Sequence, residues 1–375
     1  MKAIMNMGSI RDRVRAGERV TTEEGLYLLR DASILELGEL AMEIRRLRNP
    51  EPVITFVVDT NPNYTNVCDV DCTFCAFYRP PGHHEAYTFT IDEMMERIGR
   101  AVSMGATTVL MQGGVSPEIP FDYYVDMVRA VRERFPDVTP HFWSAPEIQG
   151  MSRVSGLTTR EVLARLKEAG QATMPGGGAE ILSDSVRRKI SHKKGGAEAW
   201  LSVHREAHEL GLRTTATMMY GHVETDEDVI RHLEAIRELQ DFHHGFTAFV
   251  PWSFKPGNTP LLIKIPQHAG PNRYLRVLAA SRIFLDNFDH IQASWFSEGK
   301  KAGQVALHWG ADDFGGTLFE ENVHACTGFV NKTTTEEIQT LIRESGFEPA
   351  QRTTLYEIIR PAQSTGEELP RRNMS

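Results

Sequence analysis

The chain has 375 residues, of which 41% are hydrophobic and 24% are charged, a composition that supports a large folded core. Its formal net charge of −9 argues against a nucleic-acid or anionic-membrane surface as its main partner. No run approaches about 18 consecutive apolar residues, so no membrane span is predicted, and the N-terminus mixes acidic and basic groups too early for a secretory signal.

The predicted elements begin with short helices in residues 1–50, where Thr21 to Glu24 form a helix-start signal. From residue 53 onward strand-like runs alternate with amphipathic helices, and Thr90 with Glu93 forms a capping box that starts the first of those helices. The strand-like runs are 53–60, 107–112, 138–144, 172–175, 213–221, 246–252, 290–295 and 311–314. Eight strands alternating with helices predict an α/β fold, a (βα)8 TIM-type barrel, with a partly open barrel as the alternative.

These patterns divide the chain into four parts. We expect an N-terminal helical extension at 1–50, the barrel at 51–320, a C-terminal helix and strand packing on the barrel at 321–360, and a flexible tail at 361–375. The expected strand of the C-terminal part is the extended piece at 354–359.

Three of the four cysteines lie in one loop directly after the first predicted strand, at Cys68, Cys72 and Cys75. The C-terminal ends of barrel strands carry the active site, and this loop follows the first of them. Three thiolates can hold three corners of a four-iron cluster and leave the fourth iron open for a ligand. A structural zinc completed by His83 or His84 is the alternative.

The fourth cysteine, Cys326, lies far along the chain and is predicted to be a small buried residue. A secreted disulfide framework would spread its cysteines in pairs along the chain, so this cysteine pattern predicts the reducing cytoplasm.

The spacing Cys-x3-Cys-x2-Cys, with Phe74 directly before the last cysteine, resembles the radical S-adenosylmethionine (SAM) superfamily. The resemblance implies a [4Fe-4S] cluster on the three cysteines and SAM as the second cofactor, whose reductive cleavage releases a 5′-deoxyadenosyl radical. It further implies that Phe74 packs beside the adenine and that Gly113 and Gly114 meet the methionine amino group. Val115 replaces the glutamate usual in the family, so that contact shifts to the backbone or to Gln112.

The same resemblance implies roles for residues after the next strands. Ser144 and Glu180 would bind the methionine end and the ribose hydroxyls of SAM, and Arg205 would reach its carboxylate. The segment 220–224 matches the adenine-binding strand of the family. The alternatives are a first-turn helix acid for Glu180 and a surface salt bridge for Arg205.

A closer resemblance extends over about residues 20–357. It rests on segments such as TNVCDVDCTFCAFYR (65–79), MPGGGAEIL (174–182) and GQVALHWGADDFGGTLFEENV (303–323), and it is to the cyclic dehypoxanthine futalosine synthase family of the futalosine route to menaquinone. Tyr78 and the segments 251–253 and 292–295 favour this family over the sister aminofutalosine synthase, which shares single motifs and is the alternative.

The resemblance implies a radical cyclisation of dehypoxanthine futalosine. The adenosyl radical takes hydrogen from the sugar C4′, the sugar radical adds to the benzoate ring, and loss of one electron and one proton restores aromaticity. A reductase such as flavodoxin or ferredoxin would supply the electron that starts the reaction.

Polar and aromatic residues near strand ends are the candidates for this chemistry. The candidate substrate-binding residues are Trp252, Ser253, Asn287, Gln292 and Trp295, and the candidate bases are His222 and Glu224, with Glu118, Glu147 and the pair His83 and His84 as substitutes. Core packing or helix capping is the alternative for each of them. The alternative classes of protein are a zinc-stapled scaffold and a TIM-barrel metal hydrolase, and the hydrolase is disfavoured because no His-x-His follows the first strand.

Overall fold

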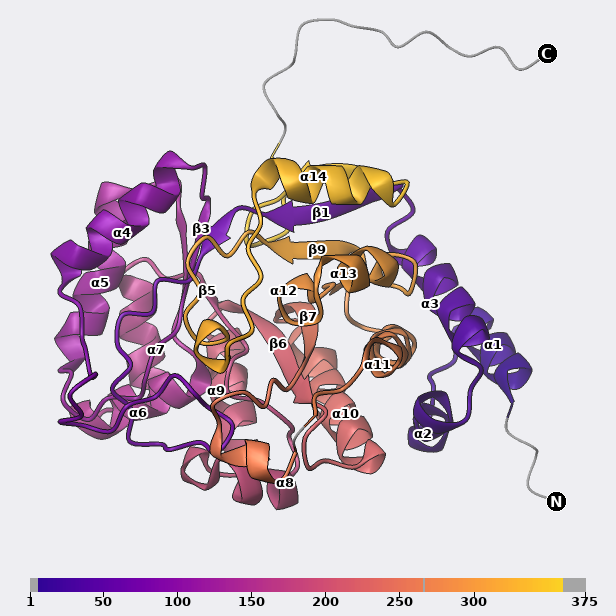
Figure 1. Ribbon diagram of the computed structural model, residues 1–375, viewed down its shortest axis with the longest axis horizontal. Helices are drawn as coiled ribbons and strands as arrows, with labels where there is room; N and C mark the ends of the chain where they lie inside the picture. The colour runs from indigo at the N-terminus through magenta and orange to yellow at the C-terminus, as the bar shows by residue number, and fades with distance from the viewer. Residues whose placement is uncertain (1–5, 266, 360–375) are drawn as a thin grey trace, which may run out of the picture.

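The computed structural model describes residues 6–265 and 267–359, so the tail predicted at 361–375 lies outside the described residues. Within the described part, no helix combines the length and the apolar character needed to cross a membrane. Three helices precede the sheet, α1 (Met7–Arg15), α2 (Thr22–Arg30) and α3 (Ile34–Arg48). Figure 1 shows them at one side of the molecule, where α2 and α3 pack against α10 (Asp226–His243) and α11 (Pro271–Phe284).

The predicted parallel barrel is confirmed. Its strands are β1 (Val53–Val57), β2 (Asp59–Thr60), β3 (Thr108–Met111), β4 (Thr139–Phe142), β5 (Thr173–Met174), β6 (Arg213–Tyr220), β7 (Phe246–Ser253), β8 (His290–Ile291) and β9 (Asp313–Gly316). β2 to β8 form one sheet in chain order, and β1, which leads directly into β2, pairs in parallel with β9. A parallel bridge between Gln292 and Asp313 joins the end of β8 to β9, so the ring of strands closes.

Helices cover the outside of the ring, and local caps explain where several of them start. The remaining helices are α4 (Ile91–Ser103), α5 (Phe121–Arg134), α6 (Ala145–Ser155), α7 (Thr159–Glu168), α8 (Asp184–Ile190), α9 (Ala197–Glu209), α12 (Trp295–Glu298), α13 (Lys300–Ala306) and α14 (Thr335–Glu344), with short turns η1 (His192–Lys194), η2 (Pro260–Ile263) and η3 (Ala325–Thr327). The capping box predicted at Thr90 and Glu93 is confirmed, and Thr21 with Glu24 forms another. Each box satisfies backbone N–H groups that a helix start leaves unpaired.

The C-terminal strand differs from the sequence prediction. It is β10 (Glu348–Gln351), and the expected extended piece at 354–359 begins with a turn at 354–355, has a positive φ of 66° at Tyr356, and returns to an antiparallel bridge between Ile358 and Arg352. β10 pairs with β1 on the side opposite β9, whereas β3 pairs with β2 further along the same strand. The C-terminal segment therefore enters the barrel wall between β1 and β3, and the Thr354 hydroxyl lies 2.7 Å from that of Thr108.

Candidate active site

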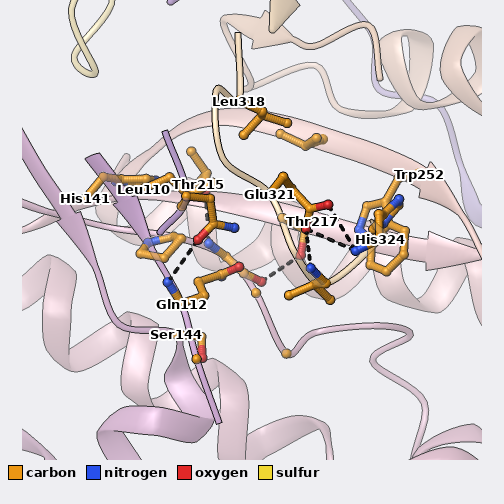
Figure 2. A pocket seen from close by; sticks show the side chains of 18 of the residues that line it. Leu110, Gln112, His141, Ser144, Thr215, Thr217, Trp252, Leu318, Glu321 and His324 are labelled. Atoms are coloured by element: carbon orange, nitrogen blue, oxygen red, sulfur yellow. Dashed lines mark hydrogen bonds between the residues drawn. The ribbon is translucent and has the colours of Figure 1, made fainter. Parts of the chain in front are cut away.

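A cavity of about 330 Å³ runs from the barrel interior to the C-terminal ends of the strands. Figure 2 shows Gln112, His141 and Ser144 on one side of it and Trp252 and His324 on the other. Of the sequence-predicted site residues, it is lined by Cys68, Cys72, Cys75, Phe74, Gln112, Gly113, Gly114, Ser144, Glu180, Trp252 and Gln292. Residues from every part of the barrel therefore meet in one space, as expected for a site at the C-terminal face.

The cysteine loop brings all three thiols to this cavity. Its backbone is held by hydrogen bonds from the Cys68 amide to Arg79 O (2.9 Å) and from the Cys75 amide to Cys72 O (3.1 Å). Burial raises the pKa of each thiol, for Cys72 to about 12, while the Lys194 ammonium acts in the opposite direction. Thiols in such a place become thiolates when a metal centre binds, because the centre supplies the compensating positive charge.

The three cysteines border the same cavity. Among the described residues, no three His, Cys, Asp or Glu side chains are grouped as the ligands of one metal ion. All three cysteines line the cavity as free thiols. This arrangement fits three corners of a polynuclear cluster with room for a further ligand.

Gly113 and Gly114 let the cysteine loop pass close to the end of β3. A Cβ on Gly114 would lie 2.0 Å from the carbonyl oxygen of Val67, and one on Gly113 would lie 2.5 Å from the Tyr64 ring. The Gly114 amide donates to Thr65 O at 2.9 Å in this contact. Gly113 and Gly114 must therefore lack a side chain for the cysteine loop to pack here. Both glycines also line the cavity.

Glu147, weighed as a substitute base, organises this region from α6. Its carboxylate accepts hydrogen bonds from the Gly113 amide (3.0 Å), the Tyr64 hydroxyl (2.9 Å) and both the amide and hydroxyl of Ser144 (2.7 and 2.5 Å). Burial raises the pKa of Glu147 to about 7 despite these donors. The other substitutes, Glu118, His83 and His84, do not line the cavity.

A buried ion pair lies between the cysteine loop and β5. The Lys194 ammonium is 2.5 Å from a Glu180 oxygen and 5.1 Å from the centre of the Phe74 ring. Burial disfavours the charge on Glu180, but Lys194 holds the pKa of this carboxyl below its usual value. Lys194 was not predicted from the sequence, and the basic run in which it lies, at 187–194, was the available signal.

Two segments after the barrel contribute residues that the sequence prediction missed. Glu321 and His324 come from the loop after β9, and Arg352 and Tyr356 come from the segment after β10. The Arg352 guanidinium pairs with Asp313 and lies 3.9 Å from the centre of the Tyr356 ring. Burial raises the pKa of Glu321 and, with nearby Lys255, lowers that of His324 to about 4.

Two further missed residues point inward from barrel strands. His141 on β4 has an Nδ1 atom without a hydrogen-bond partner in the described structure, and burial lowers its pKa to about 3, so its ring is neutral. Asp59 on β2 accepts a hydrogen bond from the Leu318 amide at 2.8 Å, and burial raises its pKa to about 6. A titratable residue within a strand-like run, 53–60 for Asp59 and 138–144 for His141, was the signal for both.

The two sequence-predicted bases lie elsewhere. His222 and Glu224 are buried and absent from the cavity lining. The Glu224 carboxylate accepts from the amides of Gly221 (2.5 Å) and His222 (2.8 Å), and the His222 ring lies 2.9 Å from the Met219 carbonyl. In this structure both side chains shape the turn after β6.

Four other predicted residues are also outside the cavity lining. Arg205 pairs with Glu198 on the surface, at 2.9 Å, and Asn287 donates to the Arg237 carbonyl at 2.8 Å. Ser253 accepts a hydrogen bond from Lys255, and the Trp295 indole donates to the Gly316 carbonyl.

A closed parallel barrel whose first loop presents three cysteines to the cavity defines the class of radical SAM enzymes. The family model of the radical SAM superfamily matches residues 62–236, and that of the CofH/MqnC C-terminal region matches residues 243–365. The chain belongs to the radical SAM superfamily, within the branch that carries this C-terminal region. Its cofactors are therefore a [4Fe-4S] cluster and SAM, and the cysteines and the cavity fit both groups.

The curated relatives cover nearly the whole chain and carry three different names. The chain is 41% identical to cyclic dehypoxanthine futalosine synthase of Halalkalibacterium halodurans, over 95% of this chain and 96% of that protein. It is 39% identical to aminodeoxyfutalosine synthase of Thermus thermophilus (94% and 95%) and 42% identical to 5-amino-6-(D-ribitylamino)uracil–L-tyrosine 4-hydroxyphenyl transferase 1 of Methanosarcina mazei (91% and 92%). Sequence identity therefore establishes the enzyme family but does not distinguish between the three reactions. The residues of the site have to decide which reaction the enzyme catalyses.

Among solved structures, the fold is similar to the hydrogenase maturase HydG from Carboxydothermus hydrogenoformans. The TM-score is 0.71 at 15% identity, and the match covers 93% of this chain and 80% of that one. At this identity the likeness concerns the fold alone.

Proposed function

We propose that this enzyme converts dehypoxanthine futalosine to cyclic dehypoxanthine futalosine by closing a carbon–carbon bond within the substrate. The observation that carries the proposal is the position of three side chains that favour the cyclase in the sequence. Tyr78, Trp252 and Gln292 come from separate segments, and all three line the cavity that receives the cysteines. Residues that face a substrate are the ones that set the reaction on a shared fold.

In this proposal the cofactors occupy the half of the cavity beside the cysteine loop. Cys68, Cys72 and Cys75 hold the cluster, and the SAM-binding residues are Phe74, Gln112, Gly113, Gly114, Ser144 and Glu180. When bound, the cluster and SAM together supply a 5′-deoxyadenosyl radical that takes a hydrogen atom from the sugar. Lys194 supplies the buried cation that the resemblance assigns to Arg205, because its ammonium faces Phe74 and Glu180.

Aromatic side chains form the wall of the substrate half. The centre of the His324 ring lies 5.1 Å from that of Trp252 and 5.3 Å from that of Phe296. Such a wall gives the benzoate ring a flat apolar surface and keeps water from a carbon radical. Gln292 and Thr217 offer polar groups to the sugar on the same lining.

The ring gives up one proton and one electron when it regains aromaticity, and the cluster, oxidised when SAM is cleaved, would accept the electron. We assign the proton to Glu321, whose carboxylate lines the cavity and already accepts hydrogen bonds from the Val323 and His324 amides at 2.8 and 3.0 Å. Burial raises its pKa, which makes this carboxylate a better proton acceptor near neutral pH. His222 and Glu224 bond to backbone groups of their own turn, as described above.

The proposal is tested by weighing products. Reconstituted, reduced enzyme is incubated with SAM and dehypoxanthine futalosine, and the expected product is lighter by two hydrogen atoms. Turnover of only the enolpyruvyl benzoate substrate of the sister enzyme, or of only L-tyrosine with the ribitylaminouracil, would refute the assignment. Glu321→Gln should slow product formation, whereas Glu320→Gln, at a carboxylate 2.7 Å from Arg97, serves as the matched control.

A further inference from the structure

Two chain segments clamp the cysteine loop at Thr73, the residue directly after Cys72. The Thr73 amide donates to the Ile190 carbonyl at 2.9 Å, and the Thr73 carbonyl accepts from the Leu261 amide at 2.9 Å. The first segment is the end of α8 with η1, and the second is η2. In Figure 1 the orange segment that contains η2 lies beside α8, at the lower edge of the molecule.

The outer side of this clamp is basic and partly apolar. We define the clamp surface as Arg188, Lys189, Lys193, Leu262, Ile263 and Lys264, all of them exposed. Ile263 is 91% exposed and Leu262 is 39% exposed, so two large aliphatic side chains of η2 face solvent directly before Lys264 in the chain. Exposed apolar groups rimmed by charges mark sites of protein association.

Acidic groups beside the clamp surface lie on the cysteine loop, at Asp69 and Asp71, and at the start of α8, at Asp184. The Lys193 ammonium lies 2.7 Å from an Asp71 oxygen and 3.0 Å from the Asp69 carbonyl, so this cation is partly neutralised. The salt bridges of the described residues do not include Arg188, Lys189 or Lys264. Three cations therefore remain available to a partner, on a chain whose net charge is −9.

We propose that the clamp surface docks a small acidic electron-carrier protein that reduces the cluster. The inference rests on the proposed radical reaction, which needs one electron from outside the chain. The donor loses one electron and the cluster gains it, and no bond or proton is exchanged. The net negative charge of the chain repels an acidic donor, so a local group of cations near Thr73 fixes where the donor approaches.

The position of the clamp surface suits electron transfer. Transfer weakens steeply with distance, and Thr73 joins the surface to the peptide units of Cys72 and Cys75 through two hydrogen bonds and a few covalent bonds. Encounters of this kind use small interfaces and rely on charge for their speed. An apolar centre of two aliphatic side chains within a basic rim has these properties.

The test measures cluster reduction by a flavodoxin with fully reduced flavin, followed as bleaching of cluster absorbance in an anaerobic stopped-flow instrument. The double variant Arg188→Glu and Lys189→Glu should slow reduction by about tenfold or more at low salt. Added salt should reduce this difference, because it screens exposed charges. Affinity between the oxidised proteins, measured by calorimetry, should fall in parallel.

The matched control reverses two exposed cations on helices that lie away from α8 in Figure 1, with Lys301→Glu on α13 and Arg343→Glu on α14. It has the same net charge, and we expect its rate to change less than twofold. Equal rates for the clamp variant and the unaltered protein, or an equal fall in both variants, would overturn the inference.

The proposed function is checked separately with excess dithionite. Each variant should then form as much 5′-deoxyadenosine as the unaltered protein, because the small reductant needs no docking surface. Loss of this yield in the unaltered protein would refute the radical function itself, whereas intact yield with an unaffected flavodoxin rate would refute only the clamp surface.

Discussion

The contact between Gly114 and the cysteine loop gives the sharpest structural prediction. In Gly114→Ala the new Cβ would lie 2.0 Å from the Val67 carbonyl oxygen and 2.6 Å from its carbonyl carbon. Both are backbone atoms directly before Cys68, so the loop has to move by about 1 Å for the atoms to reach even a tight contact. The loop is docked on either side of this point, by the Gly114 amide on Thr65 O and by the Asp69 amide on Val115 O.

Overpacking of this kind costs about 1–3 kcal/mol, and each 1.4 kcal/mol changes a population tenfold. We therefore expect Gly114→Ala to remain folded, to lose 1–3 kcal/mol of unfolding free energy in urea, and to bind clearly less iron and sulfide on reconstitution. Gly99→Ala is the matched control, because its Cβ would meet only Phe135 at an ordinary 3.5 Å within α4. That change should be neutral or stabilise by about 0.5–1 kcal/mol. Unaltered iron content and stability in Gly114→Ala would refute the packing role of this glycine.

Three further predictions follow from charged groups in and around the cavity. Asp59→Asn should gain stability relative to the unaltered protein as pH rises from 4 through 6, by at most about 3 kcal/mol. The reason is that the folded protein holds the Asp59 proton up to its raised pKa of about 6, and the buried carboxylate is destabilising above this pH. Urea unfolding of both proteins at pH 5 and pH 8 measures the difference in stability, and a difference that does not change with pH contradicts the prediction. Glu147→Gln should lose about 1–3 kcal/mol, since the amide N–H₂ would face either the two donors of Ser144 or those of Gly113 and Tyr64. Glu161→Gln in the exposed capping box of α7 should lose less, and equal losses would argue against a buried acceptor role. Lys194→Gln should weaken SAM binding by roughly tenfold, whereas Arg205→Gln should leave it unchanged. Equilibrium dialysis on the reconstituted protein measures both affinities. Weaker SAM binding by Arg205→Gln, with unchanged binding by Lys194→Gln, would restore the sequence-based assignment of Arg205.

Much of the fold could be predicted because its signals are local. Alternating apolar runs and capping residues such as Thr90 mark strands and helix starts over a few positions, and the cysteine spacing is visible in eight residues. The residues from the C-terminal part were missed for a different reason. Arg352 reaches the cavity only because β10 pairs with β1, nearly 300 positions earlier, and no local pattern reports such a pairing.

Side-chain direction explains the other differences. Lys194 and Arg205 are both basic residues after β5, but η1 turns the first toward Glu180, and the exposed side of α9 holds the second beside Glu198. His222 and Glu224 end a strand as predicted, yet the turn consumes their polar atoms in backbone hydrogen bonds. A strand end predicts proximity to the site, whereas the local turn decides whether the side chain faces it.

The most direct measurement compares the loss of one loop cysteine with the loss of the remote one. Cys72→Ala and Cys326→Ala are each prepared without oxygen, reconstituted with iron and sulfide, reduced, and given SAM. The account predicts that Cys326→Ala binds the cluster and yields 5′-deoxyadenosine like the unaltered protein, and that Cys72→Ala does neither. Formation of 5′-deoxyadenosine by Cys72→Ala, or its absence from the unaltered protein, would contradict the three-cysteine centre on which the whole account depends.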